Sequence, residues 1–261
     1  MIAKSHRRGA TRAARSHAHP KRTSDANTPP KGMPQMPRMA AVAAAVLVVV
    51  SAAAPVRAQT AAVAAPPAGE TACSFGAFVA ETDPAGLNVR AGPGTAHKVL
   101  GTLPPVRHSH DDPPLRAMVE VEVVAGDDGW FKIRAARDND ALIEGPQRPM
   151  FKGEGWVSGR KLTVKSQAQA GRQRPDAAAP IAIGGGADGA GFDSDSFVEH
   201  ARLLGCKGRW ALVEYGPWSA ETGEPAALQI APAARAGAEK GRIRAWMNHL
   251  CALQETSCDG A

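Results

Sequence analysis

Tyrosine is almost absent from this sequence, because Tyr215 is the only one in 261 residues. A row of tyrosines that grips a polyproline helix is therefore lacking, and Pro-x-x-Pro recognition of that kind is not indicated. The sequence also lacks G-x-S-x-G, H-E-x-x-H and P-loop motifs, and it has no C-x-x-C pair. We expect a protein that is not an enzyme and that has no cofactor.

A basic surface is also lacking once the N-terminal segment is set aside. The whole chain has a formal net charge of +6. Residues 1–58 hold 10 of the 31 Lys and Arg but 1 of the 25 Asp and Glu, which leaves 21 basic and 24 acidic residues and a net charge of −3. Nucleic-acid binding needs positive charge on the folded surface, so we expect no nucleic-acid partner.

Residues 1–58 have the pattern of a secretory signal peptide with an unusually long basic n-region, which we expect to be disordered. The apolar run 39–55 is shorter than the roughly 20 residues of a membrane-spanning helix, and the small residue Ala58 follows it before the expected cut. An uncleaved anchor is the alternative. We expect an exported protein, periplasmic or extracellular, without an integral membrane segment after cleavage. The true start is one of four methionines: Met1, Met33, Met36 or Met39.

All four cysteines follow the predicted cleavage site: Cys73, Cys206, Cys251 and Cys258. An even number of cysteines in an oxidising compartment predicts two disulfides. Four cysteines allow three pairings, and the sequence does not choose among them.

The most informative motif is a strand that ends in a sharp turn, at residues 87–94. Leu87 and Val89 alternate with polar residues, and Gly92-Pro93-Gly94 then forces a turn. Alternation and turn residues predict further strands, and Gly126-Asp127-Asp128-Gly129 predicts a hairpin. The expected strands are 73–80, 87–90, 98–103, 118–124, 130–134, 155–158 and 162–164.

The segment Asn88-Val89-Arg90-Ala91-Gly92-Pro93-Gly94, with Gly129-Trp130 and Gly155-Trp156 after it, resembles the motifs of bacterial SH3-like (SH3b) domains. The resemblance covers residues 83–165. It implies a small β-barrel used for binding, in a family associated with cell-wall peptides.

The sequence therefore predicts an all-β protein with an SH3-like barrel over 73–165. Residues 59–72 are predicted as a flexible spacer and 166–191 as a linker, because their Ala, Pro and Gly content favours neither a strand nor a core. Residues 192–261 repeat the pattern of a Gly-bounded turn followed by a Trp-bearing strand. We expect them to form a second, divergent SH3-like module held by disulfides, without a second copy of the Asn-Val-Arg turn.

Three residues are candidate ligand contacts: Arg90, Trp130 and Trp156. Core packing is the alternative role for the tryptophans, and a salt bridge to Glu120 or Glu122 is the alternative for Arg90. The weak metal candidates are His108, His110 and Asp111, with a solvated loop as the favoured interpretation. We expect no metal.

The favoured function is that of an exported binding module for cell-wall peptide or for an envelope protein partner. The first alternative is the targeting part, or an activator, of a cell-wall hydrolase. The second is a structural envelope component. The sequence does not indicate an oligomeric state.

Overall fold

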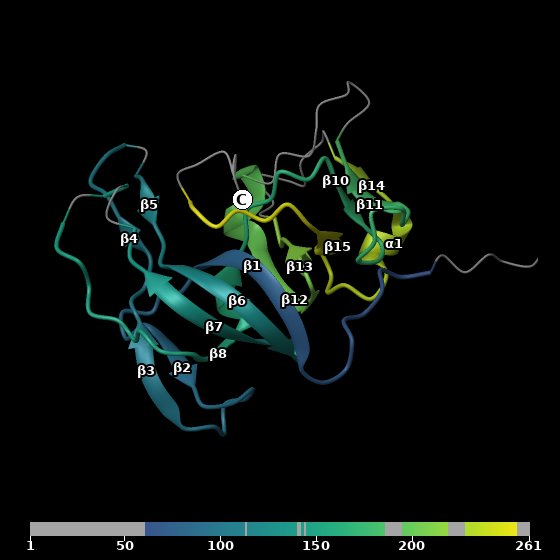
Figure 1. Cartoon of the computed structure of the whole chain (residues 1–261). Helices are drawn as coiled ribbons and strands as arrows, with labels where there is room; N and C mark the ends of the chain where they lie inside the picture. The colour runs from purple at the N-terminus through teal and green to yellow at the C-terminus, as the bar shows by residue number, and fades with distance from the viewer. Residues whose placement is uncertain are drawn as a thin grey trace, which may run out of the picture. The chain divides into compact units, whose positions relative to one another are not determined.

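The computed structural model describes residues 61–112, 114–139, 142–143, 145–185, 195–218 and 228–254 (Figure 1). The predicted signal peptide, 1–58, and Cys258 lie outside these residues. The described chain is built from antiparallel strands with one short α-helix, so the predicted all-β class is confirmed. None of the helices in these residues is long and apolar enough to span a membrane.

The first sheet has seven strands in the order β3-β2-β8-β7-β6-β1-β9. Its strands agree closely with the predicted ones. A 3₁₀ turn, η1 (Gly159–Lys161), lies between the last two strands along the chain, β8 and β9. A separate pair, β4 (Arg107–His108) with β5 (Arg116–Ala117), lies in the insertion before β6. The seven strands are β1 (Thr71–Val79), β2 (Leu87–Arg90), β3 (Val99–Leu103), β6 (Glu120–Asp127), β7 (Trp130–Arg137), β8 (Gly155–Ser158) and β9 (Leu162–Thr163).

The first sheet is open, whereas we expected a closed barrel. β3 and β9 are its two edges, and they share no ladder among the described residues. β9 has only two residues, and the outer edge of β3 is occupied by a loop, because the Phe151 amide donates to the Thr102 carbonyl oxygen (3.0 Å). A loop therefore covers the edge that barrel closure would have removed.

The second sheet has six strands in the order β12-β13-β15-β10-β11-β14. The hairpin β12–β13 and the third strand β15 are the Trp-bearing elements expected from the sequence, while a 3₁₀ helix, η2 (Asp195–His200), and α1 (Pro232–Arg235) join the strands. The strands are β10 (Ala170–Arg172), β11 (Ile181–Gly184), β12 (Ala201–Lys207), β13 (Trp210–Tyr215), β14 (Gln229–Ile230) and β15 (Ile243–Met247).

The linker prediction for 166–191 is wrong over its first part, because this part contributes β10 and β11 to the second sheet. The small residues that suggested a linker permit close packing. A Cβ on Gly171 would lie 2.4 Å from the Ala245 Cβ, and Ala182 and Ile183 are fully buried. Close approach of backbones is one of the few reasons for glycine inside a strand.

The predicted spacer, 59–72, also makes specific contacts with the second sheet. The Ala64 carbonyl oxygen accepts the Trp246 indole N–H (2.8 Å), and the Ala64 amide donates to Gln173 (2.8 Å). Thr71 and Ala72 already belong to β1. These hydrogen bonds order a segment that its composition alone predicted to be a flexible spacer.

The two sheets are copies of one arrangement. The order β3-β2-β8-β7-β6 in the first corresponds to β11-β10-β15-β13-β12 in the second. The registers also agree, because Trp156 lies opposite Lys132 and Arg90, and Trp246 lies opposite Leu212 and Arg172. We call residues 71–163 repeat 1 and residues 166–250 repeat 2.

Repeat 2 has its own version of the arginine turn, which we did not expect. The Arg90 guanidinium Nη1 donates to the Thr95 and His97 carbonyl oxygens (both 2.9 Å), across the turn after β2. The Arg172 guanidinium Nη1 donates to the Ala179 carbonyl oxygen (3.2 Å), across the turn after β10. The sequence of the second turn, Arg172-Gln173-Arg174-Pro175-Asp176, keeps the arginine and the proline but not the glycines, so it does not match the motif of the first turn.

One hydrophobic core runs through both repeats. It includes Val89 and Phe131 of repeat 1 together with Leu203 and Val213 of repeat 2, all at most 1% exposed. η1 and β12 pack so closely that a Cβ on Gly159 would lie 2.4 Å from the Leu203 carbonyl oxygen. The repeats therefore stabilise each other, as expected for units too small to bury a core alone.

Candidate functional site

The three predicted ligand contacts are placed unevenly. Trp156 is 6% exposed and belongs to the buried residues, so its ring offers little surface to a ligand. Trp130 is half-buried at the start of β7. Arg90 uses its guanidinium to hold the turn after β2, so neither of its proposed carboxylate partners is used: Glu120 pairs with Arg137 and Glu122 with Arg134.

The three metal candidates lie on the surface. His108 ends β4, while His110 and Asp111 follow in a turn, and all three are exposed. Within the described ranges no group of three or more His, Cys, Asp or Glu could hold a metal ion.

The disulfide that joins the two repeats is Cys73–Cys206, whose Cα atoms are 6.0 Å apart and 133 residues apart in sequence. The prediction that these two cysteines form disulfides is confirmed. Cys251 is also disulfide-bonded. The remaining cysteine, Cys258, lies beyond the described residues.

A cleft of about 600 Å³ lies where the repeats meet. One wall is formed by residues of β1, β6 and β7 in repeat 1. The other wall comes from the tip of the β12–β13 hairpin and from the chain after β15. The lining residues that carry polar or aromatic groups are Ser74, Phe75, Glu122, Arg134, Gln167, Arg209, Trp210, Asn248 and His249.

The cleft combines apolar surface with charge. Phe75 and Trp210 are half-buried, so parts of both rings remain accessible. Arg134 donates to Glu122 (2.8 Å), and these two charges offset each other. Arg209 is exposed and forms no ion pair with any residue in the described part of the chain. Aromatic faces beside a few convergent polar groups are typical of small-molecule and peptide sites.

Local backbone geometry places the cleft residues. Phe75 follows a register shift in β1, between Ala72 and Phe75. Trp210 follows the hairpin turn at Gly208, whose φ is 57°. His249 has a φ of 50°, in the left-handed region that histidine adopts far less often than glycine. Such backbone strain is a recurrent property of binding sites.

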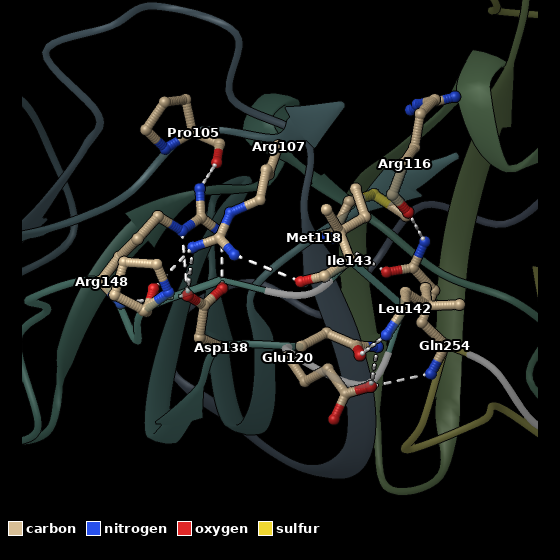
Figure 2. Close-up of polar contacts among 12 residues, drawn as sticks. Pro105, Arg107, Arg116, Met118, Glu120, Asp138, Leu142, Ile143, Arg148 and Gln254 are labelled. Atoms are coloured by element: carbon tan, nitrogen blue, oxygen red, sulfur yellow. Dashed lines mark hydrogen bonds and ion pairs between the residues drawn. The ribbon is translucent and has the colours of Figure 1, made fainter. Parts of the chain in front are cut away.

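The segment after β15 is fixed to repeat 1 by Gln254 (Figure 2). The Gln254 side-chain oxygen accepts the Met118 amide (2.9 Å), and its nitrogen donates to the Arg116 carbonyl oxygen (2.5 Å). The Gln254 amide donates to the buried carboxylate of Glu120 (2.8 Å). The Gln254 side-chain amide thus satisfies backbone groups of repeat 1 as a neighbouring strand would. The cleft wall formed by His249 and Ala252 is therefore held by β15 before it and by Gln254 after it.

A second polar cluster orders the long loops of repeat 1 (Figure 2). The Asp138 side chain is 2% exposed and accepts from Arg107 (3.3 Å) and from Arg148 (2.5 Å). Arg107 also donates to Pro146 (3.0 Å), and Arg148 donates to Pro105. Burial alone would raise the pKa of Asp138, but the hydrogen bonds and charges of the two arginines outweigh it and lower that pKa. This cluster stabilises the insertion that carries His108.

Sequence reasoning missed the cleft as a site. It placed Trp210 only in the repeated pattern of a Gly-bounded turn and a Trp-bearing strand, and Phe75 only in the expected strand 73–80. The one sequence feature that could have indicated the cleft is the repeated pattern, because it places a second tryptophan, Trp210, at the tip of a second hairpin. The Cys73–Cys206 pairing brings Phe75 and Trp210 to the same place, and the sequence did not provide it.

Comparisons of the chain with protein-family models, with curated proteins and with solved structures give no match.

Proposed function

We propose that this chain is an exported, non-enzymatic binding protein of the bacterial SH3-like kind, and that the cleft between its repeats binds peptide from the cell wall or from an envelope protein partner. The observation that carries the proposal is the cleft itself, in which Phe75 and Trp210 lie beside Arg209, Asn248 and His249. A short peptide offers such a site apolar side chains, amides and a carboxylate together.

The sequence features support the compartment. The pattern of residues 1–58 is that of a signal peptide, and Cys73–Cys206 is the kind of bond that persists outside the cytoplasm. The net charge of −3 after residue 58 disfavours nucleic acid as the partner.

The test is retention of the full-length exported chain on purified cell-wall sacculi. Trp210→Ala removes an aromatic face from the cleft, and we expect it to weaken retention about tenfold, as for a central aromatic contact. Trp130→Ala is the matched control, because Trp130 has the equivalent place at the hairpin tip of repeat 1 and does not line the cleft.

The three functional readings give different results. Retention that depends on Trp210 but not on Trp130 supports the proposal. No retention, with a stable protein partner recovered by crosslinking, would favour the structural envelope component. A clearing band from the chain on a wall-containing gel would favour the hydrolase alternative.

A further inference from the structure

The two repeats carry inverted charges at equivalent positions. In repeat 1, Arg134 on β7 pairs with Glu122 on β6, directly opposite in register (2.8 Å). In repeat 2, Glu214 on β13 accepts from Arg202 on β12, again directly opposite (2.6 Å). Glu214 and Arg134 each lie four residues after the hairpin tryptophan of their repeat. The charges at these two positions are therefore of opposite sign in the two repeats.

The third strand extends this inversion. Arg244 on β15 lies opposite Glu214 and donates to it (2.7 Å). Glu154 has the corresponding place in repeat 1, two residues before the β8 tryptophan. Its charge raises the pKa of Arg134, after the larger effects of Glu122. The pattern is Glu-Arg-Glu in repeat 1 and Arg-Glu-Arg in repeat 2.

The two charge clusters, Glu122-Arg134-Glu154 in repeat 1 and Arg202-Glu214-Arg244 in repeat 2, differ in what covers them. In repeat 2 the Glu214 side chain is fully buried, and the Arg242 guanidinium, from the loop before β15, lies 3.7 Å from its carboxylate. Glu239 of that loop places one oxygen 2.8 Å from Arg202 and the other 3.3 Å from Arg242. In repeat 1 the Glu122 and Arg134 side chains are 56% and 53% exposed, and they line the open cleft. Repeat 2 thus contains its own occupant at the position that repeat 1 leaves open.

Glu239, which fills this position in repeat 2, indicates the charge of the ligand group that would fill it in repeat 1. Glu239 is an acidic group that meets the flanking Arg202. The equivalent flanking residue in repeat 1 is Glu122, so an occupant of the same geometry would meet it with a cation. At the other wall, the exposed guanidinium of Arg209 favours a carboxylate, which arginine binds bidentately.

We propose that the cleft binds a short zwitterionic peptide, with an ammonium group against Glu122, a carboxylate against Arg209, and its apolar part against Phe75 and Trp210. This inference rests on the proposed function, because it assumes that the cleft is the binding site. Cell-wall peptide and a protein segment can both supply this chemistry.

The experiment is a calorimetric titration of the full exported chain with three synthetic tripeptides. The first is N-acetylated Ala-Lys-Ala with a free carboxyl end, so that the lysine side chain carries its single ammonium group. The second has norleucine in place of lysine, which removes the ammonium group, and the third has a C-terminal amide. We expect each change to weaken binding about tenfold or more, as for loss of a charge-assisted hydrogen bond.

Protein variants identify the partners. With Glu122→Gln, the lysine and norleucine peptides are expected to bind equally, and with Arg209→Gln, the acid and the amide are expected to bind equally. Glu154→Gln is the matched control, because Glu154 flanks Arg134 on its other side and does not line the cleft. Equal thermal unfolding of the variants verifies that each is folded.

Each outcome decides one of the two claims. If Glu122→Gln and Arg209→Gln leave both tripeptide preferences and sacculus retention unchanged, while Trp210→Ala weakens binding, the proposed function stands and the zwitterion inference is wrong. If neither sacculi nor any tripeptide bind the wild-type chain, both are wrong. Sacculus retention that falls with Glu122→Gln and Arg209→Gln identifies wall peptide as the source of the charges.

Discussion

Removing the disulfide between the repeats is expected to destabilise the protein strongly. The perturbation is the double replacement Cys73→Ser with Cys206→Ser, since a single replacement would leave a thiol free to exchange. The bond closes a loop with a sequence separation of 133 residues. The chain-entropy relation for a loop of this length gives about 5 kcal/mol at 25 °C, which is the upper end of measured losses.

The environment of the sulfurs adds to this loss. Cys73 is 7% exposed and Cys206 1% exposed, so a serine hydroxyl at either position is buried. A buried hydroxyl without a partner costs about 1–3 kcal/mol in proteins. The variant Cys73→Ala with Cys206→Ala removes the bond without adding hydroxyls, and it separates the two contributions.

The assay is urea unfolding of the oxidised chain, followed by tryptophan fluorescence. We expect the alanine pair to lower the free energy of unfolding by about 3–5 kcal/mol, and the serine pair by about 2 kcal/mol or more beyond that, since it buries two hydroxyls. Binding to sacculi should fall as well, because Ser74 and Phe75 directly follow Cys73 in the cleft wall. A loss below about 1 kcal/mol for the alanine pair would refute the reasoning, since it would show that the repeats are held together without the bond.

Three further replacements test the ordering contacts by urea unfolding. Asp138→Asn breaks the buried ion pairs with Arg107 and Arg148 and should cost about 3 kcal/mol at pH 7. Because the folded pKa of Asp138 is lowered, this stability is present above the ordinary Asp pKa of about 3.9 and is lost as the pH falls through the folded pKa; a penalty that persists in strong acid would contradict the assignment. Gln254→Ala leaves two backbone groups without partners and should cost about 2 kcal/mol, and an unchanged midpoint would count against the anchoring role. Gly171→Ala overpacks a strand contact and should cost about 1–3 kcal/mol, whereas a linker residue would tolerate it.

Local signals made the strands of repeat 1 predictable. The Asp128-Gly129 turn shows why: both residues have positive φ, 43° and 76°, as a two-residue hairpin requires. Alternation of buried and exposed side chains then specified β2 and β6 from their own residues. These features depend on neighbours in sequence, so the sequence contains them directly.

The start of repeat 2 was less predictable, because close packing hides it. Gly171 stands where repeat 1 has Val89, and an apolar residue is absent because β15 approaches the backbone too closely to admit a Cβ. The strand therefore lost the alternation that identified β2. Only the arginine at its end and the proline in its turn indicated its role.

The cleft could not be predicted from local patterns at all. It exists because β1 and the β12–β13 hairpin, more than a hundred residues apart, are joined by Cys73–Cys206. Four cysteines permit three pairings, and each would bring different side chains together. Neither Phe75 nor Trp210 has a local feature that marks it as part of a site.

The most direct test of the account is the response of the five tryptophan indole N–H signals to soluble cell-wall peptide in an NMR titration. The cleft predicts that the Trp210 signal shifts, while the signals of the buried Trp156 and Trp246 remain in place. A shift centred on Trp130 with none at Trp210, or no shift at any indole at saturating peptide, would contradict binding in the cleft between the repeats.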